Sequence, residues 1–217
     1  AITIDDLAFH PNPLKTWIGM TEGLVKTLKK HNIHAAMFVA GRNVDKPEGK
    51  QILQTWNDAG HIIANHTYFH RNFHSSEISV DAEMQDIIKG ERIIQGYPNF
   101  TRLFRFPMLK EGDTVTKRDA LRSFLKQRGY RIGHVPIDTS DWYIDQRFRE
   151  KLAWDPLADY ARHRDYYLEH LLKCSKYYGD LSQEVTGRSI KHTLVIHHNL
   201  LNALFLDDVL TMFKRHG

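Results

Sequence analysis

Short apolar, β-prone runs alternate along this chain with longer segments in which hydrophobic residues recur every three to four positions. The first pattern predicts strands and the second predicts amphipathic helices. The predicted strands are Ala1–Ile4, Ile33–Ala40, His61–Asn65, Arg102–Phe106, Arg131–Ile137 and His192–Ile196. The predicted helices are Trp17–His31, Pro47–Ala59, Val80–Gln95, Thr116–Arg128, Asp155–Tyr178 and Phe205–Arg215.

Several residues mark the expected ends of these helices. Gly60, Gly96 and Gly129 each follow a predicted helix, where glycine commonly ends the helix. Thr116 is a suitable N-cap for the helix that it begins. Strands that alternate with helices predict a parallel α/β fold. The chain carries no glycine-rich phosphate loop, which argues against a nucleotide-binding version of that fold.

Length and composition favour an ordinary globular protein. The 217 residues suit a single domain spanning 1–217, with 41% hydrophobic and 26% charged residues. No apolar run is long enough for a transmembrane segment. The net charge of +4 comes from scattered basic residues, which does not support a nucleic-acid partner. The lone Cys174 excludes an internal disulfide, and we interpret it as a buried helical thiol.

Five of the predicted strands run directly into side chains that can do chemistry. These strand ends carry Asp5-Asp6, His66 to His70, Arg105-Phe106-Pro107, Asp138 to Trp142, and His197-His198. In a parallel α/β barrel the carboxyl ends of the strands share one face, where active sites are built. The sequence therefore predicts an active site at that face.

His66 and His70 have the i, i+4 spacing that, on one helical turn, lets two imidazoles face a single metal. The chain contains 14 histidines, so such a pair also arises by chance, and His70 and His74 form a second one. The spacing alone therefore leaves open surface or capping histidines.

Asp5 and Asp6 give a stronger indication, because they follow the apolar Ile4 directly. Two adjacent carboxylates in a cleft repel each other unless one of them binds a cation. Arg105 lies between two phenylalanines, which suggests a partly buried guanidinium that needs an anionic partner.

The remaining groups have ordinary structural alternatives. Asp141 and Trp142 also suit a turn aspartate and a core indole. His197 and His198 also suit histidines satisfied in the core, and since side chains alternate along a strand, only one of the two can point into a cleft.

Together these residues resemble the polysaccharide deacetylases of carbohydrate esterase family four, which share the NodB homology domain. The resemblance covers most of the chain, and its motifs appear in the family's order. They are Thr3-Ile4-Asp5-Asp6-Leu7, His66-Thr67-Tyr68-Phe69-His70, Arg105-Phe106-Pro107-Met108, Asp138 to Trp142, and Leu194-Val195-Ile196-His197. Leu7 replaces the family's glycine and Met108 replaces its aromatic residue, so the first loop and the substrate packing are expected to differ. The segment around 143–190 is expected to be a helical insertion.

The resemblance implies a distorted (β/α) barrel of seven or eight parallel strands, with the active site at their carboxyl ends. It implies that Asp6, His66 and His70 bind a divalent metal, most simply Zn²⁺, with Co²⁺ or another transition metal as alternatives. Asp5 is implied as the general base, and Arg105 as its partner.

The same resemblance assigns the acid and the substrate contacts. His197 is implied as the general acid, oriented by Asp141, and a register shifted by one residue would give that role to His198. It implies that Met108 offers a backbone N–H to the oxyanion, that Trp142 lines the acetyl pocket and that Pro107 binds substrate. The implied reaction is metal-dependent hydrolysis of N-acetyl groups from an amino-sugar polymer such as peptidoglycan, a chitin-like chain or a surface polysaccharide, which releases acetate.

Two other functions stay open on the sequence. One is a metal-dependent amidohydrolase of a small, non-polymeric amide, which the departures at Leu7 and Met108 keep open. The other is a non-catalytic sugar-binding relative, which is expected to lose Asp5 or the acid histidine, and both are present. The chain opens at Ala1 without methionine, so we expect a removed leader or a trimmed chain, and a periplasmic or secreted protein, with a cytoplasmic location still open.

Overall fold

A computed structural model describes residues 1–216 of the chain. The chain separates into two compact units, each considered by itself below. The first unit comprises Ala1–Ile4, Ala8–Ala35 and the chain from Val135 onward, and the second comprises Asp5–Leu7 and Ala36–His134. Among the described residues, no helix combines the length and the apolar character that crossing a membrane requires.

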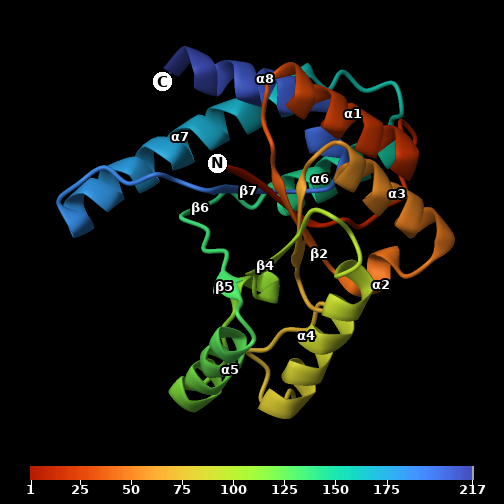
Figure 1. Ribbon diagram of the computed structural model, residues 1–217. Coiled ribbons are helices and arrows are strands. Elements are labelled where there is room, and N and C mark those ends of the chain that lie inside the picture. Colours follow the sequence, from red (N-terminus) through yellow and green to blue (C-terminus); the bar gives the residue numbers. More distant parts are fainter. Residues whose placement is uncertain (217) are drawn as a thin grey trace. The chain divides into compact units, whose positions relative to one another are not determined.

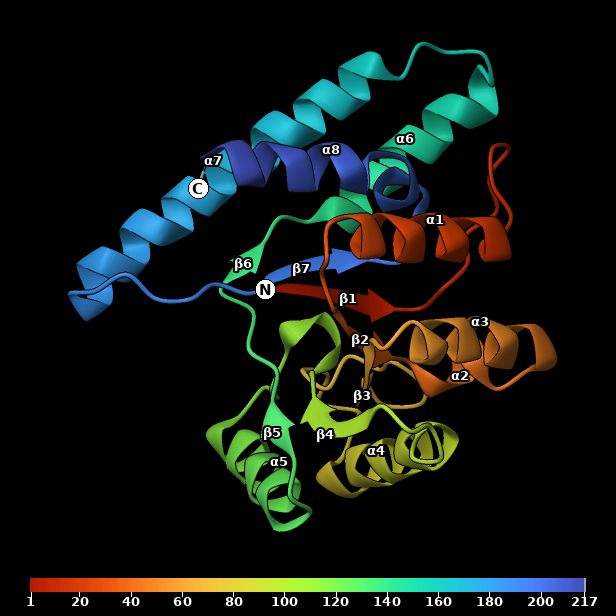
Figure 2. The ribbon, with the colours of Figure 1, turned by 45° about the horizontal axis from the view of Figure 1, so that its top comes forward.

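The second unit is built on parallel strands in the order β5-β4-β3-β2, with the end of β1 as the next strand. Registers such as Val39↔Asn65 and Asn65↔Phe104 bring the carboxyl ends of neighbouring strands together. Figures 1 and 2 show the helices of this unit, with α4 and α5 near β4 and β5. Its elements are β1 (Ile2–Asp6, shared with the first unit), β2 (Ala36–Val39), α2 (Gly41–Val44), α3 (Pro47–Asp58), β3 (Ile62–Asn65), α4 (Val80–Ile94), β4 (Phe100–Phe104), the 3₁₀ turn η1 (Pro107–Leu109), α5 (Val115–Gln127) and β5 (Arg131–Ile132).

An aromatic and aliphatic core holds the carboxyl end of β4 in place. Phe104 and Phe106 meet edge to face, with ring centroids 4.9 Å apart. They belong to a buried cluster formed with α4 and α5, whose other members are Phe73, Ile87, Leu121, Leu125 and Tyr130. Because Arg105 lies between these two anchored rings, its backbone position is fixed by the packing on either side.

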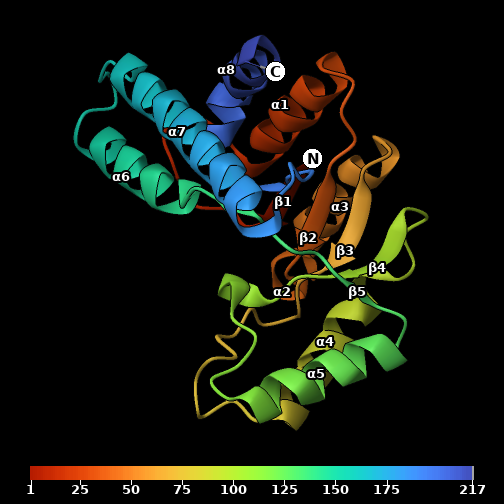
Figure 3. The same ribbon diagram turned by 90° about the vertical axis from the view of Figure 1, so that its left-hand side faces the viewer.

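The first unit joins β1 to β7 and β7 to β6. Leu194 N–H donates to Ala1 O, and Thr3 Oγ1 donates to Leu194 O, while β6 runs parallel to β7. Helix α8 contacts α1, α6 and α7, and Figure 3 shows these four helices grouped together. The elements of this unit are α1 (Trp17–Lys30), β6 (Ile137–Asp138), α6 (Asp141–Trp154), α7 (Ala161–Thr186), β7 (Leu194–His197) and α8 (Leu200–His216).

The expected alternation of strands and helices is found, and two of the predicted helix stops are confirmed by backbone geometry. Gly60 and Gly129 have φ of 79° and 75°, the left-handed conformation that glycine adopts at little cost. The predicted N-cap of α5 is wrong. Thr114, not Thr116, precedes this helix and accepts the Lys117 N–H with its hydroxyl.

Two further element predictions need correction. The strand predicted over 131–137 is in fact two short strands, β5 and β6. The last backbone hydrogen bond of this segment to β4 is donated by Gly133 N–H to Phe104 O, and the chain stops pairing with β4 after that residue. The segment 143–190 contains all of α7 and most of α6, and the predicted helix list had no helix at the position of α6. Cys174 lies on α7 and is partly buried.

Candidate metal centre and acid–base groups

The two adjacent aspartates separate in direction because β1 ends in a tight turn. Leu7 N–H donates to Asp5 O at 3.0 Å, and Asp6, at the centre of this three-residue turn, has φ of 77°. This is the rare and strained form of the γ-turn. Leu7 follows with φ of 50° and a fully buried side chain. A left-handed leucine costs about 1–2 kcal/mol, which its buried side chain offsets.

The two histidines reach their positions through a loop, so the expectation that they share a helical turn is wrong. Residues 66–79 contain no helix. Thr67 and His70 instead adopt left-handed backbone conformations, with φ of 63° and 55°. The loop is tied to the end of β3, where Asn65 Oδ1 accepts Thr67 N–H, and to its own side chains, where Thr67 Oγ1 accepts His70 N–H. Local side-chain hydrogen bonds within this loop, rather than helical periodicity, accompany a separation of 4.9 Å between the centroids of the two rings.

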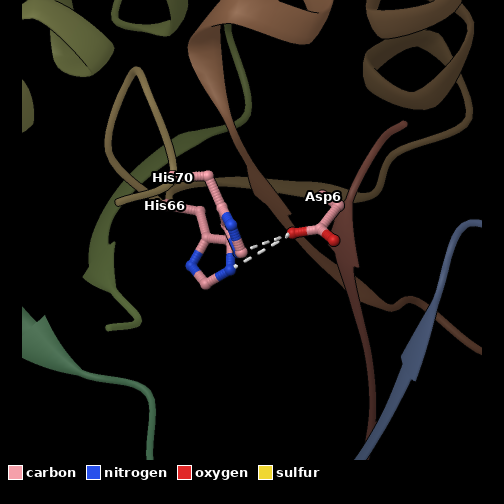
Figure 4. Close-up of side chains that lie close together, drawn as sticks. All are labelled: Asp6, His66 and His70. Carbon is pink, nitrogen blue, oxygen red and sulfur yellow. Dashed lines mark ion pairs between the residues drawn. The ribbon is translucent and has the colours of Figure 1, made fainter. Parts of the chain in front are cut away.

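Asp6, His66 and His70 converge in the second unit with donor atoms within 4.8 Å of one another (Figure 4). Asp6 Oδ1 lies 3.4 Å from His66 Nε2 and 3.1 Å from His70 Nε2. Ligands about 2.0–2.1 Å from a tetrahedral zinc lie about 3.3 Å from one another, so these separations suit a divalent transition metal.

The hydrogen bond on the other side of His66 strengthens this fit. His66 Nδ1 lies 2.8 Å from the Arg105 carbonyl, which can only accept, so Nδ1 must carry the proton. In the neutral ring, Nε2 therefore offers a lone pair toward Asp6 and Asp5, whose nearest oxygens are 3.4 and 3.8 Å away. Either a proton or a metal ion can bridge this lone pair and the carboxylates, and metal-binding histidines are typically fixed in this way through the distal nitrogen.

Arg105 has the buried anionic partner that its sequence context suggested. Its Nη1 donates to Asp5 Oδ1 at 2.5 Å, its Nε donates to Gly133 O, and its guanidinium lies 3.9 Å from the centre of the Phe38 ring. Burial lowers the pKa of Arg105, and the charge of Asp5 opposes that shift. The salt bridge leaves Asp5 Oδ2 on the side of His66.

The 3₁₀ turn after Arg105 presents the third predicted motif. Pro107 is buried, whereas the Met108 side chain is 54% exposed. Met108 and Leu109 both have positive φ, and the turn is closed by Leu109 N–H donating to Phe106 O. The turn therefore holds the Met108 backbone in a defined, unusual conformation.

In the first unit, Asp141 and His197 form a close pair. Asp141 is fully buried at the first position of α6, and its Oδ1 accepts His197 Nδ1–H at 2.6 Å. Its Oδ2 accepts three further donors, from His197 N, Asn199 Nδ2 and Asn202 Nδ2. Burial alone would raise the pKa of Asp141, but His197 and these hydrogen bonds lower it overall. The carboxylate is therefore ionised and fixes the His197 ring with Nε2 directed away from it.

His198 has a different environment from its neighbour. Its ring is buried, with Nδ1 on the Ala8 carbonyl at 3.1 Å and Nε2 on the Thr21 hydroxyl at 2.9 Å. Burial lowers its pKa to about 4, so the ring is neutral at physiological pH. This is the environment of a structural histidine, and it contrasts with the carboxylate-paired His197.

Trp142 adjoins the Asp141 pair at the start of α6, and its side chain is 52% exposed. In each unit the sequence did not identify several buried polar residues. For α4 of the second unit, the helical periodicity does indicate that some carboxylates are buried. Three carboxylates occupy the buried stripe of that helix alongside its apolar residues, and they are Glu83, Asp86 and Glu91. The other missed residues are Asn65, Tyr130, Asn199 and Asn202.

Comparisons with known proteins bear on the family and the fold of this chain. A family profile described as polysaccharide deacetylase matches residues 1–132. The chain is 30% identical over 148 residues to the peptidoglycan-N-acetylglucosamine deacetylase of Bacillus cereus, covering 65% of this chain and 46% of that protein. It is 27% identical over 154 residues to the peptidoglycan-N-acetylmuramic acid deacetylase PdaA of Bacillus subtilis, covering 70% of this chain and 55% of that protein. The chain thus spans about half the length of these curated relatives.

Solved structures match over the whole chain. A mutant with restored enzymatic activity of BA3943, a carbohydrate esterase family 4 pseudoenzyme from Bacillus anthracis, superimposes with a TM-score of 0.71 at 21% identity. The match covers 100% of this chain and 62% of that one. At this identity the likeness concerns the fold alone. It confirms the expected fold class, a distorted (β/α) barrel, here with seven strands among the described residues.

Proposed function

The chain belongs to the polysaccharide deacetylase family, and on that premise we propose that it hydrolyses N-acetyl groups of an amino-sugar polymer with the help of a divalent metal. The observation that carries the proposal is the convergence of Asp6, His66 and His70, with the Asp5–Arg105 salt bridge beside it. The names of the curated relatives favour peptidoglycan over other polymers. That substrate places the site of action outside the cytoplasm.

In this proposal Asp6, His66 and His70 hold the metal. When bound, a divalent ion of this kind lowers the pKa of a coordinated water toward about 7 and polarises the acetamide carbonyl. Zn²⁺ suits the donor set of one carboxylate and two imidazoles, and Co²⁺ suits it as well.

Asp5 serves as the general base. Its Oδ1 is held by Arg105, so Oδ2 is the oxygen that remains for the proton of the attacking water. The water oxygen bonds to the acetyl carbon while the carbonyl electrons move to oxygen, and the backbone N–H of Met108 is assigned to stabilise that developing charge. Arg105 is a positioning residue, since its guanidinium is fixed by Asp5, Gly133 and Phe38.

His197 serves as the general acid. As the carbon–nitrogen bond breaks, it donates a proton to the leaving amine, and the products are acetate and a free amino sugar. Its role is supported by the Asp141 carboxylate on Nδ1, which stabilises the charged imidazolium and leaves Nε2 as the acidic position. On the family resemblance, Trp142 is assigned to the acetyl pocket and Pro107 to substrate binding.

Acetate release tests the proposal. Metal-free protein, the same protein with Zn²⁺ or Co²⁺ restored, and Asp5→Asn with metal are assayed on peptidoglycan, chitin oligosaccharides and small acetamides. We expect acetate from a glycan only when metal is present and Asp5 is intact. Release from small amides alone would favour the small-amide hydrolase instead. Glycan binding by the metal-loaded wild type without any acetate release would favour a non-catalytic relative.

A further inference from the structure

The loop that carries His70 rests on helix α4 of the second unit, and one α4 carboxylate reaches into it. Asp86 is a charged residue, yet it is only 3% exposed and lies on the buried side of α4 together with the core residue Ile87. Both of its carboxylate oxygens accept the backbone N–H of Phe69, at 3.2 and 3.1 Å. Phe69, the residue immediately before His70, is therefore fixed by a charge-assisted hydrogen bond that it donates to a carboxylate of a neighbouring helix.

Asp86 also acts on Thr67, at the other end of the loop. The Thr67 hydroxyl donates to Asp86, and the same oxygen accepts the His70 backbone N–H at 3.0 Å. A hydroxyl has one proton and two lone pairs. Because Asp86 takes the proton, a lone pair of Thr67 Oγ1 is left for His70, and the carboxylate sets the direction of the second bond through the first.

These bonds hold a backbone that would otherwise relax. Thr67 and His70 both have positive φ, at 63° and 55°, and such residues cost about 1–3 kcal/mol each unless their surroundings enforce the conformation. Helix α4 approaches the loop so closely that a Cβ on Gly90 would lie 2.7 Å from the Thr67 carbonyl atoms. The approach brings Asp86 within reach of Phe69 N–H.

We propose that Asp86 is a positioning residue for the metal ligand His70, acting through Phe69 N–H and through the Thr67 hydroxyl. This inference rests on the proposed function, in which His70 binds the metal. Asp86 does not ligate the ion itself. It keeps the loop in the conformation that points His70 Nε2 at Asp6.

Zinc affinity and the visible spectrum of the Co²⁺-loaded protein, measured on Asp86→Asn and Asp86→Ala, test the inference. We expect the zinc dissociation constant to rise about 10- to 100-fold and the Co²⁺ absorption bands to shift, as losses around a metal ligand usually produce. The matched control is Asp81→Asn, which removes the same charge from an exposed position on α4. It should bind zinc as the wild type does.

An unchanged zinc dissociation constant and Co²⁺ spectrum in Asp86→Asn and Asp86→Ala, with only the thermal midpoint lowered, would show a merely structural role and overturn the inference. If the Asp86 variants fail to fold, Thr67→Val and Thr67→Ser test the same relay. The valine variant should lose zinc affinity, the serine variant should retain it, and equal affinities would overturn the inference. A wild type that binds no zinc would instead refute the proposed function.

Discussion

Replacing Asp141 with asparagine should disable the proposed acid while leaving the proposed metal ligands unchanged. The wild-type carboxylate accepts four N–H groups, one on Oδ1 and three on Oδ2. An asparagine has only one oxygen, and the geometry favours placing it where the three donors converge. Its amide nitrogen then faces His197 Nδ1. Two donors cannot face each other, so the His197 proton must move to Nε2, and the ring loses the anion that stabilised its charged form.

The magnitudes follow from these bonds. Loss of one charge-assisted acceptor at a fully buried position should lower the free energy of unfolding by about 1–3 kcal/mol. Loss of general-acid catalysis should lower kcat by about 10²- to 10⁴-fold. The wild-type rate should fall as pH rises through the pKa of the acid, and Asp141→Asn should lose that alkaline limb.

The assay is acetate release as a function of pH, together with ¹⁵N NMR of the imidazoles to read the tautomer of His197. Asp180→Asn, which makes the same change on an exposed part of α7, is the control and should behave as the wild type does. If Asp141→Asn folds and keeps a near-normal rate with an unchanged alkaline limb, the assignment of His197 as an acid governed by Asp141 is wrong.

Three further predictions concern other residues of the two units. His197→Ala should cut kcat strongly and retain zinc, whereas His198→Ala should lower stability with little effect on kcat. If acetate release shows the opposite pattern, His198 and not His197 is the general acid. Gly90→Ala should lower the free energy of unfolding by about 1–3 kcal/mol and weaken zinc binding, because the alanine methyl would overlap the Thr67 carbonyl group. Wild-type results in both zinc titration and urea unfolding would refute this prediction. His198 has a folded pKa of about 4 against 6.5 for the free side chain, so between these values the unfolded chain binds a proton that the folded chain does not. The wild type should therefore lose up to about 3 kcal/mol relative to His198→Gln as pH falls from above 6.5 to 4, and equal pH dependence in urea unfolding would contradict the assigned environment.

Local chemistry made much of the fold predictable. Hydrophobic periodicity located the main helices, and Gly60 and Gly129 ended two of them as expected. The N-cap of α5 was misplaced because Thr114 and Thr116 are chemically equivalent candidates, and only the path of the chain chooses between them. Helix α6 was missed because its apolar residues follow a weak periodicity and its buried face includes Asp141 and Asp145.

The site was predictable where residues are adjacent in sequence and less so where tertiary contacts decide. Asp5, Asp6 and Arg105 stand out at strand ends, and the structure joins Asp5 to Arg105. The helical turn expected for His66 to His70 does not form, because the loop's backbone N–H groups donate instead to the side chains of Asn65, Thr67 and Asp86. Asp86 lies sixteen residues beyond His70 in the sequence. No local sequence pattern predicts that its side chain contacts the loop that carries His70.

The central claim is that Asp6 binds a catalytic metal while its neighbour Asp5 handles the proton. Calorimetric titration of Zn²⁺ into metal-free wild type, Asp5→Asn and Asp6→Asn, followed by acetate release from peptidoglycan on the same samples, tests it directly. We predict similar zinc affinity for the wild type and Asp5→Asn, an affinity at least about 100-fold weaker for Asp6→Asn, and acetate release by the zinc-loaded wild type alone. Equal zinc affinities in the two variants, or full acetate release by the metal-free wild type, would contradict the account.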